Sequence, residues 1–208
     1  MNKEINIIKF IIDFDSTFIR LEALDELCLI SLKKNPDRKK IIKEFRQLTN
    51  LGMEGKLSFS ESLKARIRLL NASKTDIDNL VKKLGRKVSD SVKRNKKFFM
   101  KYGKNIYIVS GGFKEIILPV VAKYHIPEKN VFANTFTFGK SGNITGFDTK
   151  NLLSQNNGKI KLLKKLGLNG ILYVIGDGYT DYELKKEGIV HKFFAFTESI
   201  ERQIVTEN

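Results

Sequence analysis

Residues 7–17 read Ile-Ile-Lys-Phe-Ile-Ile-Asp-Phe-Asp-Ser-Thr, an apolar run that leads directly into two carboxylates and two hydroxyls. Asp13 and Asp15 lie two positions apart, so on an extended chain both side chains point to the same face. Two like charges that face one another at the end of a buried strand are costly, because burial and repulsion both disfavour ionisation. A bound divalent cation commonly offsets that cost, which makes this segment a candidate metal and catalytic site.

Apolar strands and amphipathic helices alternate along the rest of the chain. After the strand at 7–13, the stretch 22–101 has only helical patterns. The other expected strands are 105–110, 171–175 and 192–196, and the other expected helices are 114–124, 159–166, 181–187 and 198–205. This alternation predicts an α/β fold with a Rossmann-like, doubly wound parallel sheet.

Two insertions are expected in this core. The helical stretch between the first two strands is too long for a simple crossover. We therefore expect residues 1–17 and 102–208 to form the core and residues 18–101 to form a helical cap. Alternating strands at 131–138 and 143–147 flank a Gly-Lys-Ser-Gly turn, which predicts a hairpin. We assign this small insert to residues 133–150.

The chain of 208 residues is strongly basic, with a formal net charge of +15. Between Lys82 and Lys104 there are ten Lys or Arg and a single acid, Asp90. Such a segment fits either a nucleic-acid or anionic partner or a solvated helical face. Apolar residues recur through it at helical spacing and no nucleic-acid motif is present, so we expect a solvated face and no nucleic-acid partner.

Composition also limits the compartment and the kinds of site. No apolar run reaches the roughly 18 residues that suggest a membrane span, and the first residues lack the apolar stretch of a secretory signal. The single Cys28 lies in an apolar run, which favours a buried thiol. Because one cysteine cannot form an internal disulfide, we expect a cytoplasmic protein that does not associate with a membrane. One cysteine excludes a thiolate zinc site, and no nucleotide-binding P-loop occurs.

Three polar clusters follow three of the expected strands. In a doubly wound sheet, ligands bind beyond the carboxyl ends of the strands. The clusters are Asp13 with Asp15, then Ser110-Gly111-Gly112, then Asp177-Gly178-Tyr179-Thr180-Asp181. Each is weak evidence alone, but together at successive strand ends they predict a metal-dependent phosphate site.

The acidic residues of the first and third clusters suit Mg²⁺, which prefers a few hard oxygen ligands. Asp13 and Asp177 supply carboxylates, and the backbone carbonyl of Asp15 is a candidate third ligand. Asp181 lies four residues after Asp177, where it can orient the ligands from behind.

The same residues suit phosphoryl transfer. Asp13, beside the metal, can attack phosphorus and form an aspartyl-phosphate. Asp15 is then free to protonate the leaving alkoxide and afterwards to activate water. The hydroxyl of Ser110 and the amide of Gly111 can donate hydrogen bonds to a phosphoryl oxygen.

A lysine is expected to neutralise the remaining phosphoryl charge. Lys159 begins the helix that precedes the third cluster and is the first candidate. Lys161 is the alternative, because the residues around both are basic and the spacing alone does not choose between them.

These segments resemble the haloacid-dehalogenase-like superfamily and, within it, the phosphoserine phosphatase branch. Two further stretches, 15–27 and 53–66, are similar to the cap segments of that branch. The motifs that carry the resemblance are Asp13-Phe-Asp-Ser-Thr17, Ser110-Gly-Gly-Phe113, Gly158-Lys159 followed by Leu162-Leu163, and Gly176-Asp-Gly-Tyr-Thr-Asp181.

The resemblance adds roles for residues that the pattern alone does not single out. It implies that Glu22 binds the ammonium group of the substrate and Arg66 its carboxylate. It also implies that Met53 and Phe59 cover the site from the cap and that Thr180 lies beside the phosphate.

The implied activity is Mg²⁺-dependent hydrolysis of O-phosphoserine to serine and phosphate, the last step of serine synthesis. One alternative is a phosphatase or phosphotransferase that acts on another small phosphate ester. Another is a non-catalytic nucleic-acid-binding module that uses the basic face. The sequence leaves open a homodimer and a C-terminal partner domain.

Overall fold

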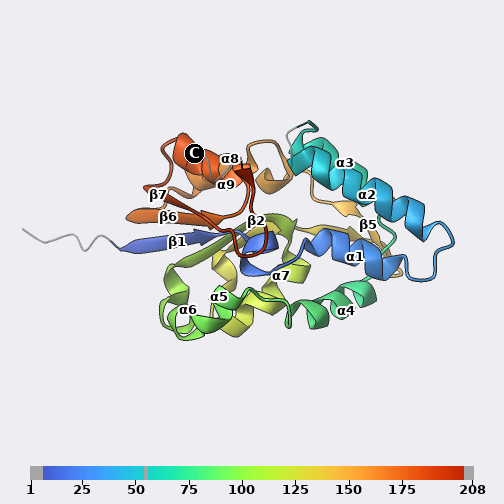
Figure 1. Cartoon of the computed structure of the whole chain (residues 1–208), viewed down its shortest axis with the longest axis horizontal. Helices are drawn as coiled ribbons and strands as arrows, with labels where there is room; N and C mark the ends of the chain where they lie inside the picture. The colour runs from blue at the N-terminus through green and yellow to red at the C-terminus, as the bar shows by residue number, and fades with distance from the viewer. Residues whose placement is uncertain (1–6, 54–55, 204–208) are drawn as a thin grey trace, which may run out of the picture.

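A five-stranded parallel sheet forms the centre of the molecule (Figure 1). The structure is a computed structural model, which describes residues 7–53 and 56–203. The strand order is β3-β2-β1-β6-β7, and every pairing within the sheet is parallel. The strands are β1 (Ile8–Ile12), β2 (Ile106–Phe113), β3 (Val131–Asn134), β6 (Ile171–Gly176) and β7 (Lys192–Ala195). The order reverses direction at β1, so the doubly wound fold predicted from the sequence is confirmed.

Helices cover both faces of this sheet. They are α1 (Ala23–Ser31), α2 (Arg38–Met53), α3 (Phe59–Leu69), α4 (Lys74–Leu84), α5 (Asp90–Arg94), α6 (Lys96–Tyr102), α7 (Lys114–Val121), α8 (Gly158–Leu166) and α9 (Tyr179–Lys186). Neighbouring side chains of a strand point to opposite faces. Ile11 accordingly packs with Leu163 of α8 and Leu184 of α9, whereas Ile12 packs in the larger core with Ile116 of α7.

The helices between β1 and β2 begin with local sequence signals. Ser58 precedes α3, and its side chain and that of Glu61 form the predicted capping box. Ser73 and Asp76 form a second capping box before α4. These caps satisfy backbone amides that a helix start would otherwise leave unpaired.

The two chain connections to α1–α4 run side by side. Ile19 and Val88 form an antiparallel bridge, and the amide of Ser89 donates to the carbonyl of Phe18 over 3.0 Å. Beyond this bridge, the ring of Phe98 in α6 packs edge-on against Phe10 of β1. We therefore propose that the cap ends at Val88 and that α5 and α6 belong to the core, although the sequence placed residues up to 101 in the cap.

The expected hairpin is present but smaller than predicted. Phe136–Phe138 (β4) pairs antiparallel with Ile144–Phe147 (β5). The expectation of one strand over 131–138 is wrong, because its first four residues form β3 and pair in parallel with β2. The chain changes partner at Thr135, and the ring of Phe136 then stacks on Phe113.

The expected helix at 198–205 is also wrong for residues 198–202, which are not helical; residues 204–205 lie outside the described part. The carboxylate of Glu198 instead accepts hydrogen bonds from the amides of Asp90 (2.5 Å) and Ser91 (2.9 Å), at the start of α5. A carboxylate stabilises the amides of a helix start, so this contact holds the segment in a non-helical course.

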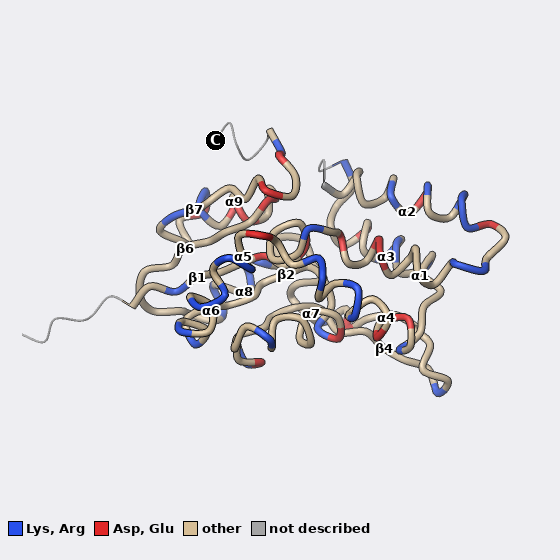
Figure 2. The backbone as a smooth tube through the Cα atoms, turned by 60° about the horizontal axis from the view of Figure 1, so that its bottom comes forward, with Lys and Arg blue, Asp and Glu red and all other residues tan. Residues whose placement is uncertain are grey.

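Basic residues recur along α2, α5 and α6, where Figure 2 colours their positions on the backbone blue. All ten Lys and Arg residues between Lys82 and Lys104 are exposed, whereas Val88, Val92 and Phe99 are buried. The predicted solvated helical face is therefore confirmed in this segment.

None of the helices in residues 7–53 and 56–203 combines the length and apolar character that crossing a membrane requires.

Candidate active site

The segment that follows β1 forms a tight turn, Phe14–Phe18, which positions the first motif. The amide of Phe14 donates to Oδ1 of Asp13 over 2.7 Å, so the turn fixes this carboxylate. Ser16 has a φ of 52°, an unfavourable conformation for a residue with a side chain. Its hydroxyl donates to Glu22 over 2.7 Å, which helps to hold the turn.

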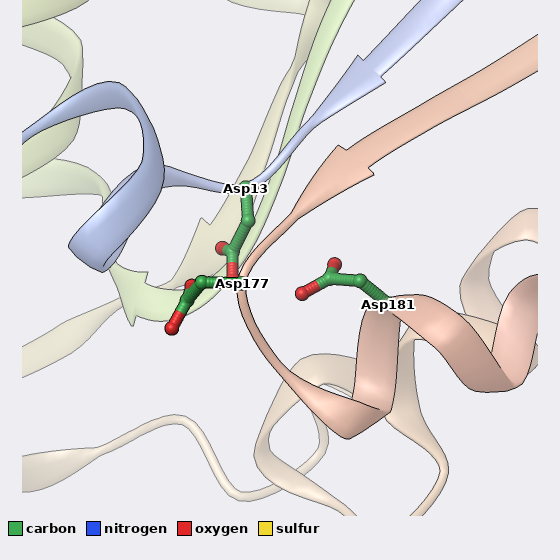
Figure 3. Close-up of side chains that lie close together, drawn as sticks. All are labelled: Asp13, Asp177 and Asp181. Atoms are coloured by element: carbon green, nitrogen blue, oxygen red, sulfur yellow. The ribbon is translucent and has the colours of Figure 1, made fainter. Parts of the chain in front are cut away.

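Three carboxylates from distant parts of the chain meet beyond the strand ends. Figure 3 shows Asp13 after β1, Asp177 in the turn after β6 and Asp181 on α9. One oxygen from each can be chosen so that all three lie within 4.8 Å of one another. The prediction that the first and third clusters come together is confirmed, and Asp181 is near enough to be a ligand itself.

Lys159 is buried between two of these carboxylates. Its Nζ lies 2.9 Å from Oδ2 of Asp13 and 2.7 Å from Oδ1 of Asp181. Burial alone lowers the pKa of this ammonium, but the charges of Asp13 and Asp181 outweigh that effect and raise it. Lys161 is exposed and donates to Gln155, so the structure brings Lys159 rather than Lys161 to the acidic cluster.

Asp15 is held apart from the three clustered carboxylates. Its Oδ1 accepts a hydrogen bond of 2.7 Å from the amide of Ala23, at the start of α1. A Cβ added to Gly112 would lie 3.0 Å from Oδ2 of Asp15, so the carboxyl lies against the second motif. Burial, followed by the charge of Glu22, raises its pKa well above the ordinary value, which favours a protonated acid.

The second motif forms a close turn at the end of β2. The amide of Gly112 donates to Oγ of Ser110 over 3.0 Å. This leaves the hydroxyl hydrogen of Ser110 available for another acceptor. The ring of Phe59, from α3, covers Gly111 so closely that an added Cβ would lie 2.6 Å from Cζ.

Of the two residues expected to recognise an amino acid, Arg66 is buried and Glu22 is half-buried. Burial raises the pKa of Glu22 from 4.5 to about 7, although the hydrogen bond from Ser16 opposes the shift. Arg66 is 8% exposed, and its Nε has no hydrogen-bond partner within the described part of the chain. Burial lowers the pKa of Arg66, while the charges of Asp25 and Glu22 favour its charged form. The carboxyl group of Glu22 and the guanidinium of Arg66 therefore both lie near the first motif.

For two residues expected to contact the substrate, Thr180 and Met53, the structure gives little information. Thr180 lies exposed at the start of α9, and no hydrogen bond of its side chain is seen among the described residues. The backbone of Met53 ends α2, but its side chain lies outside the described part of the structure.

Arg202 is a site residue that no sequence pattern predicted. Its Nε donates to Oδ2 of Asp177 over 2.9 Å, and its guanidinium lies 3.8 Å from Oε1 of Glu22. No motif marks this arginine, since the pattern around it predicts a helix. Thr17 belongs to the first motif, and its hydroxyl donates to Oδ1 of Asp177 over 3.1 Å.

The acidic cluster fits a hard divalent cation. In an octahedral Mg²⁺ site, oxygen ligands about 2.0–2.1 Å from the ion lie about 2.9 Å apart when adjacent and about 4.2 Å apart when opposite. Three oxygens within 4.8 Å of one another are therefore close enough for side-chain movement to bring them onto one ion. Oδ2 of Asp181 is buried and has no hydrogen-bond partner among the described residues, as expected for an atom that awaits a cation. Burial raises the pKa of Asp177 as well, and a cation would reverse that effect.

The curated proteins similar to this chain include several that share one name. No protein-family model matches the chain. The chloroplastic phosphoserine phosphatase of Arabidopsis thaliana is 32% identical over 94% of this chain, which spans only 65% of that protein's length. The human phosphoserine phosphatase is 30% identical, with 94% of this chain and 84% of that protein covered.

The solved structures include a similar protein of nearly the same extent. The crystal structure of a phosphoserine phosphohydrolase-like protein from Francisella tularensis subsp. tularensis SCHU S4 superimposes with a TM-score of 0.84. It is 32% identical, and the match covers 97% of this chain and 92% of that one.

Proposed function

Because the chain belongs to the phosphoserine phosphatase family, within the haloacid-dehalogenase-like superfamily, we propose that it hydrolyses O-phosphoserine to serine and phosphate. One observation carries the proposal: the end of β1 brings Asp13 within reach of Lys159 and of Asp177. That arrangement supplies a fixed carboxylate nucleophile in a site with neutralising charge.

In the first step, Asp13 attacks the phosphorus atom. The hydrogen bond from Phe14 and the ion pair with Lys159 hold the two carboxylate oxygens in fixed directions. A bond forms between the carboxylate and phosphorus while the bond from phosphorus to the serine oxygen breaks. Asp15, whose raised pKa retains a proton, gives that proton to the leaving oxygen.

In the second step, water cleaves the aspartyl-phosphate. Asp15 is now ionised and takes a proton from the attacking water, which releases phosphate and regenerates Asp13. The structure favours Asp15 for this exchange, because the amide of Ala23 holds it beside the second motif and apart from the acidic cluster.

Asp13 and Asp177 would hold the Mg²⁺ ion, with Asp181 close behind or as a further ligand. When bound, Mg²⁺ supplies positive charge that polarises the phosphoryl group. We also propose that the backbone carbonyl of Asp15 contributes to the metal site, and that Lys159 balances the negative charge of the cluster.

The phosphoryl oxygens would be bound by the hydroxyl of Ser110, the amide of Gly111 and the ammonium of Lys159. Preorganised donors of this kind stabilise the charge that develops in the transition state. Thr180 is the second residue of α9, and we propose that it contacts the phosphate when substrate is present.

Recognition of the amino-acid part is assigned to Glu22 and Arg66. A carboxylate suits the substrate ammonium, and a buried guanidinium with an unpartnered Nε suits its carboxylate. Phe59 and Met53 would cover the site from the cap. The guanidinium of Arg202 lies near Glu22, so the substrate ammonium must share or replace this contact.

Phosphate release from a panel of phosphate esters tests the substrate. O-Phosphoserine is expected to be hydrolysed in the presence of Mg²⁺ with a higher kcat/KM than phosphoethanolamine, which lacks the carboxylate that Arg66 would bind. Adding small alcohols as acceptors distinguishes hydrolysis from phosphoryl transfer. Equal rates for the two esters, or transfer in preference to hydrolysis, would contradict the proposal.

A further inference from the structure

Asn134 is a buried residue that connects two parts of the site without belonging to any motif. It ends β3 and is fully shielded from solvent. Its Nδ2 donates to the carbonyl of Gly111 over 2.8 Å and to the carbonyl of Leu153 over 3.2 Å. Since both partners are acceptors, both amide hydrogens of this side chain are used.

The first contact fixes the phosphate-binding turn. The peptide group that joins Gly111 to Gly112 is held at both polar atoms. Its oxygen accepts from Asn134, and its N–H donates to Ser110. Because the orientation of this peptide constrains its neighbours, the contact with Asn134 restricts where the Ser110 hydroxyl and the Gly111 amide can lie.

The second contact reaches the segment that carries the lysine. Leu153 belongs to a short helical turn, Leu152–Ser154, just before α8. Gly158 packs against this turn so tightly that an added Cβ would lie 2.4 Å from the carbonyl oxygen of Leu152. Lys159 is the next residue after Gly158. Asn134 therefore connects the Ser110–Gly112 turn to the segment that leads into Lys159.

Stability alone explains this asparagine poorly. In residues 7–53 and 56–203, its Oδ1 is buried without a hydrogen-bond partner. A buried unpaired acceptor is costly, and most buried polar atoms are satisfied. This cost is easier to explain if the two hydrogen bonds that the Nδ2 group of Asn134 donates serve the function of the protein.

We propose that Asn134 is a positioning residue for phosphate binding, which fixes the Ser110–Gly112 turn relative to Lys159. This inference rests on the proposed function, because it assumes that these donors bind phosphate. Asn134 itself does not touch the phosphoryl group in this account and acts through Gly111 and Leu153.

The chain offers a closely matched control in Asn130. It is also buried, at 4% exposure, and its Nδ2 donates to two carbonyls, those of Lys104 and Ile106, each over 3.0 Å. These contacts lie near the opposite end of β2. Asn130→Leu therefore removes two comparable hydrogen bonds, one of them to β2, without touching the phosphate-binding turn and without adding charge.

The test compares Asn134→Leu with Asn130→Leu, using calorimetric titration of inorganic phosphate with Mg²⁺ present and thermal unfolding. Leucine has nearly the shape of asparagine but neither donors nor charge, so loss of the two hydrogen bonds is expected to weaken phosphate binding by about tenfold or more in Asn134→Leu. Asn130→Leu should lose comparable thermal stability but keep its phosphate affinity within about twofold. Should Asn134→Leu fail to fold, Asn134→Ser takes its place, because it also adds no charge and its single hydroxyl hydrogen cannot serve both carbonyls.

Unchanged phosphate affinity in the Asn134 variant would overturn the inference, as would an equal loss in both variants. Phosphate binding is measured without turnover, so the result is separate from the proposed activity. A wild-type protein that binds phosphate but does not hydrolyse phosphoserine would contradict the proposed function alone.

Discussion

At the scale of single residues, buried charge decides how this site behaves. Lys159 compensates two carboxylates at once, whereas Lys161, two positions later, is exposed. The sequence placed both in the same helix and ranked Lys159 first without excluding Lys161, because burial depends on which face of α8 packs on the sheet. Arg202 is the larger omission, since only the folded chain brings a residue so near the C-terminus to Asp177.

Replacing Lys159 with methionine is expected to reduce stability and activity together. The change leaves Asp13 and Asp181 buried without their cation, which costs about 3–5 kcal/mol when one partner of a buried pair is removed. Chemical denaturation measures this loss. Lys161→Met is the matched control and should stay within about 0.5 kcal/mol of wild type. A larger effect in the control than in Lys159→Met would contradict the assignment.

The pKa of Glu22 predicts a specific pH dependence of stability. Folding raises this pKa from 4.5 to about 7, so between these values the folded protein binds more protons than the unfolded chain. The contribution of Glu22 to the free energy of unfolding is therefore full below about pH 4.5 and decreases by up to about 3 kcal/mol as pH rises to about 7.

Glu22→Gln removes this contribution, because the amide does not titrate. Denaturation at several pH values should therefore give wild type a steeper loss of stability than the variant between about pH 4.5 and 7. Parallel pH profiles for the two proteins would show that the pKa of Glu22 is not raised.

At the scale of elements, most strands and their order along the chain were predicted from the sequence, but the order of the strands within the sheet and the partners of two segments were not. The alternating pattern over 131–138 is equally compatible with a hairpin strand and with a short strand of the main sheet, and the structure uses it for both β3 and β4. The pattern at 198–205 is compatible with a helix, yet the contact of Glu198 with α5 prevents one up to residue 202. Long-range contacts outweighed local propensity in both places.

The contact between α3 and the end of β2 gives an element-scale prediction. In Gly111→Ala, the new Cβ would meet the Phe59 ring at 2.6 Å, so the variant should lose about 1–3 kcal/mol of stability and bind substrate less well. Phe59→Ala removes the obstructing ring. Denaturation of both single variants and the double variant should therefore reveal a coupling of at least about 1 kcal/mol. Additive losses would mean that the ring does not lie over Gly111.

At the scale of the whole molecule, the parallel sheet explains why the meeting of distant site residues could be predicted from the sequence. The three motifs are separated by as many as 160 residues, as in the hydrogen bond from Thr17 to Asp177. Parallel strands bring their carboxyl ends to one edge, so order and strand ends were enough to predict the meeting of Asp13 with Asp177. The contacts of Asn134 and Arg202 depend on packing between segments, and no local pattern encodes them.

The central claim is that Asp13 becomes phosphorylated during turnover. Rapid acid quench of the protein with radiolabelled O-phosphoserine and Mg²⁺, followed by peptide mapping, tests it directly. We expect label on the peptide that contains Asp13, and neither label nor phosphate release with Asp13→Asn. Label on another residue, or undiminished phosphate release by Asp13→Asn, would contradict it.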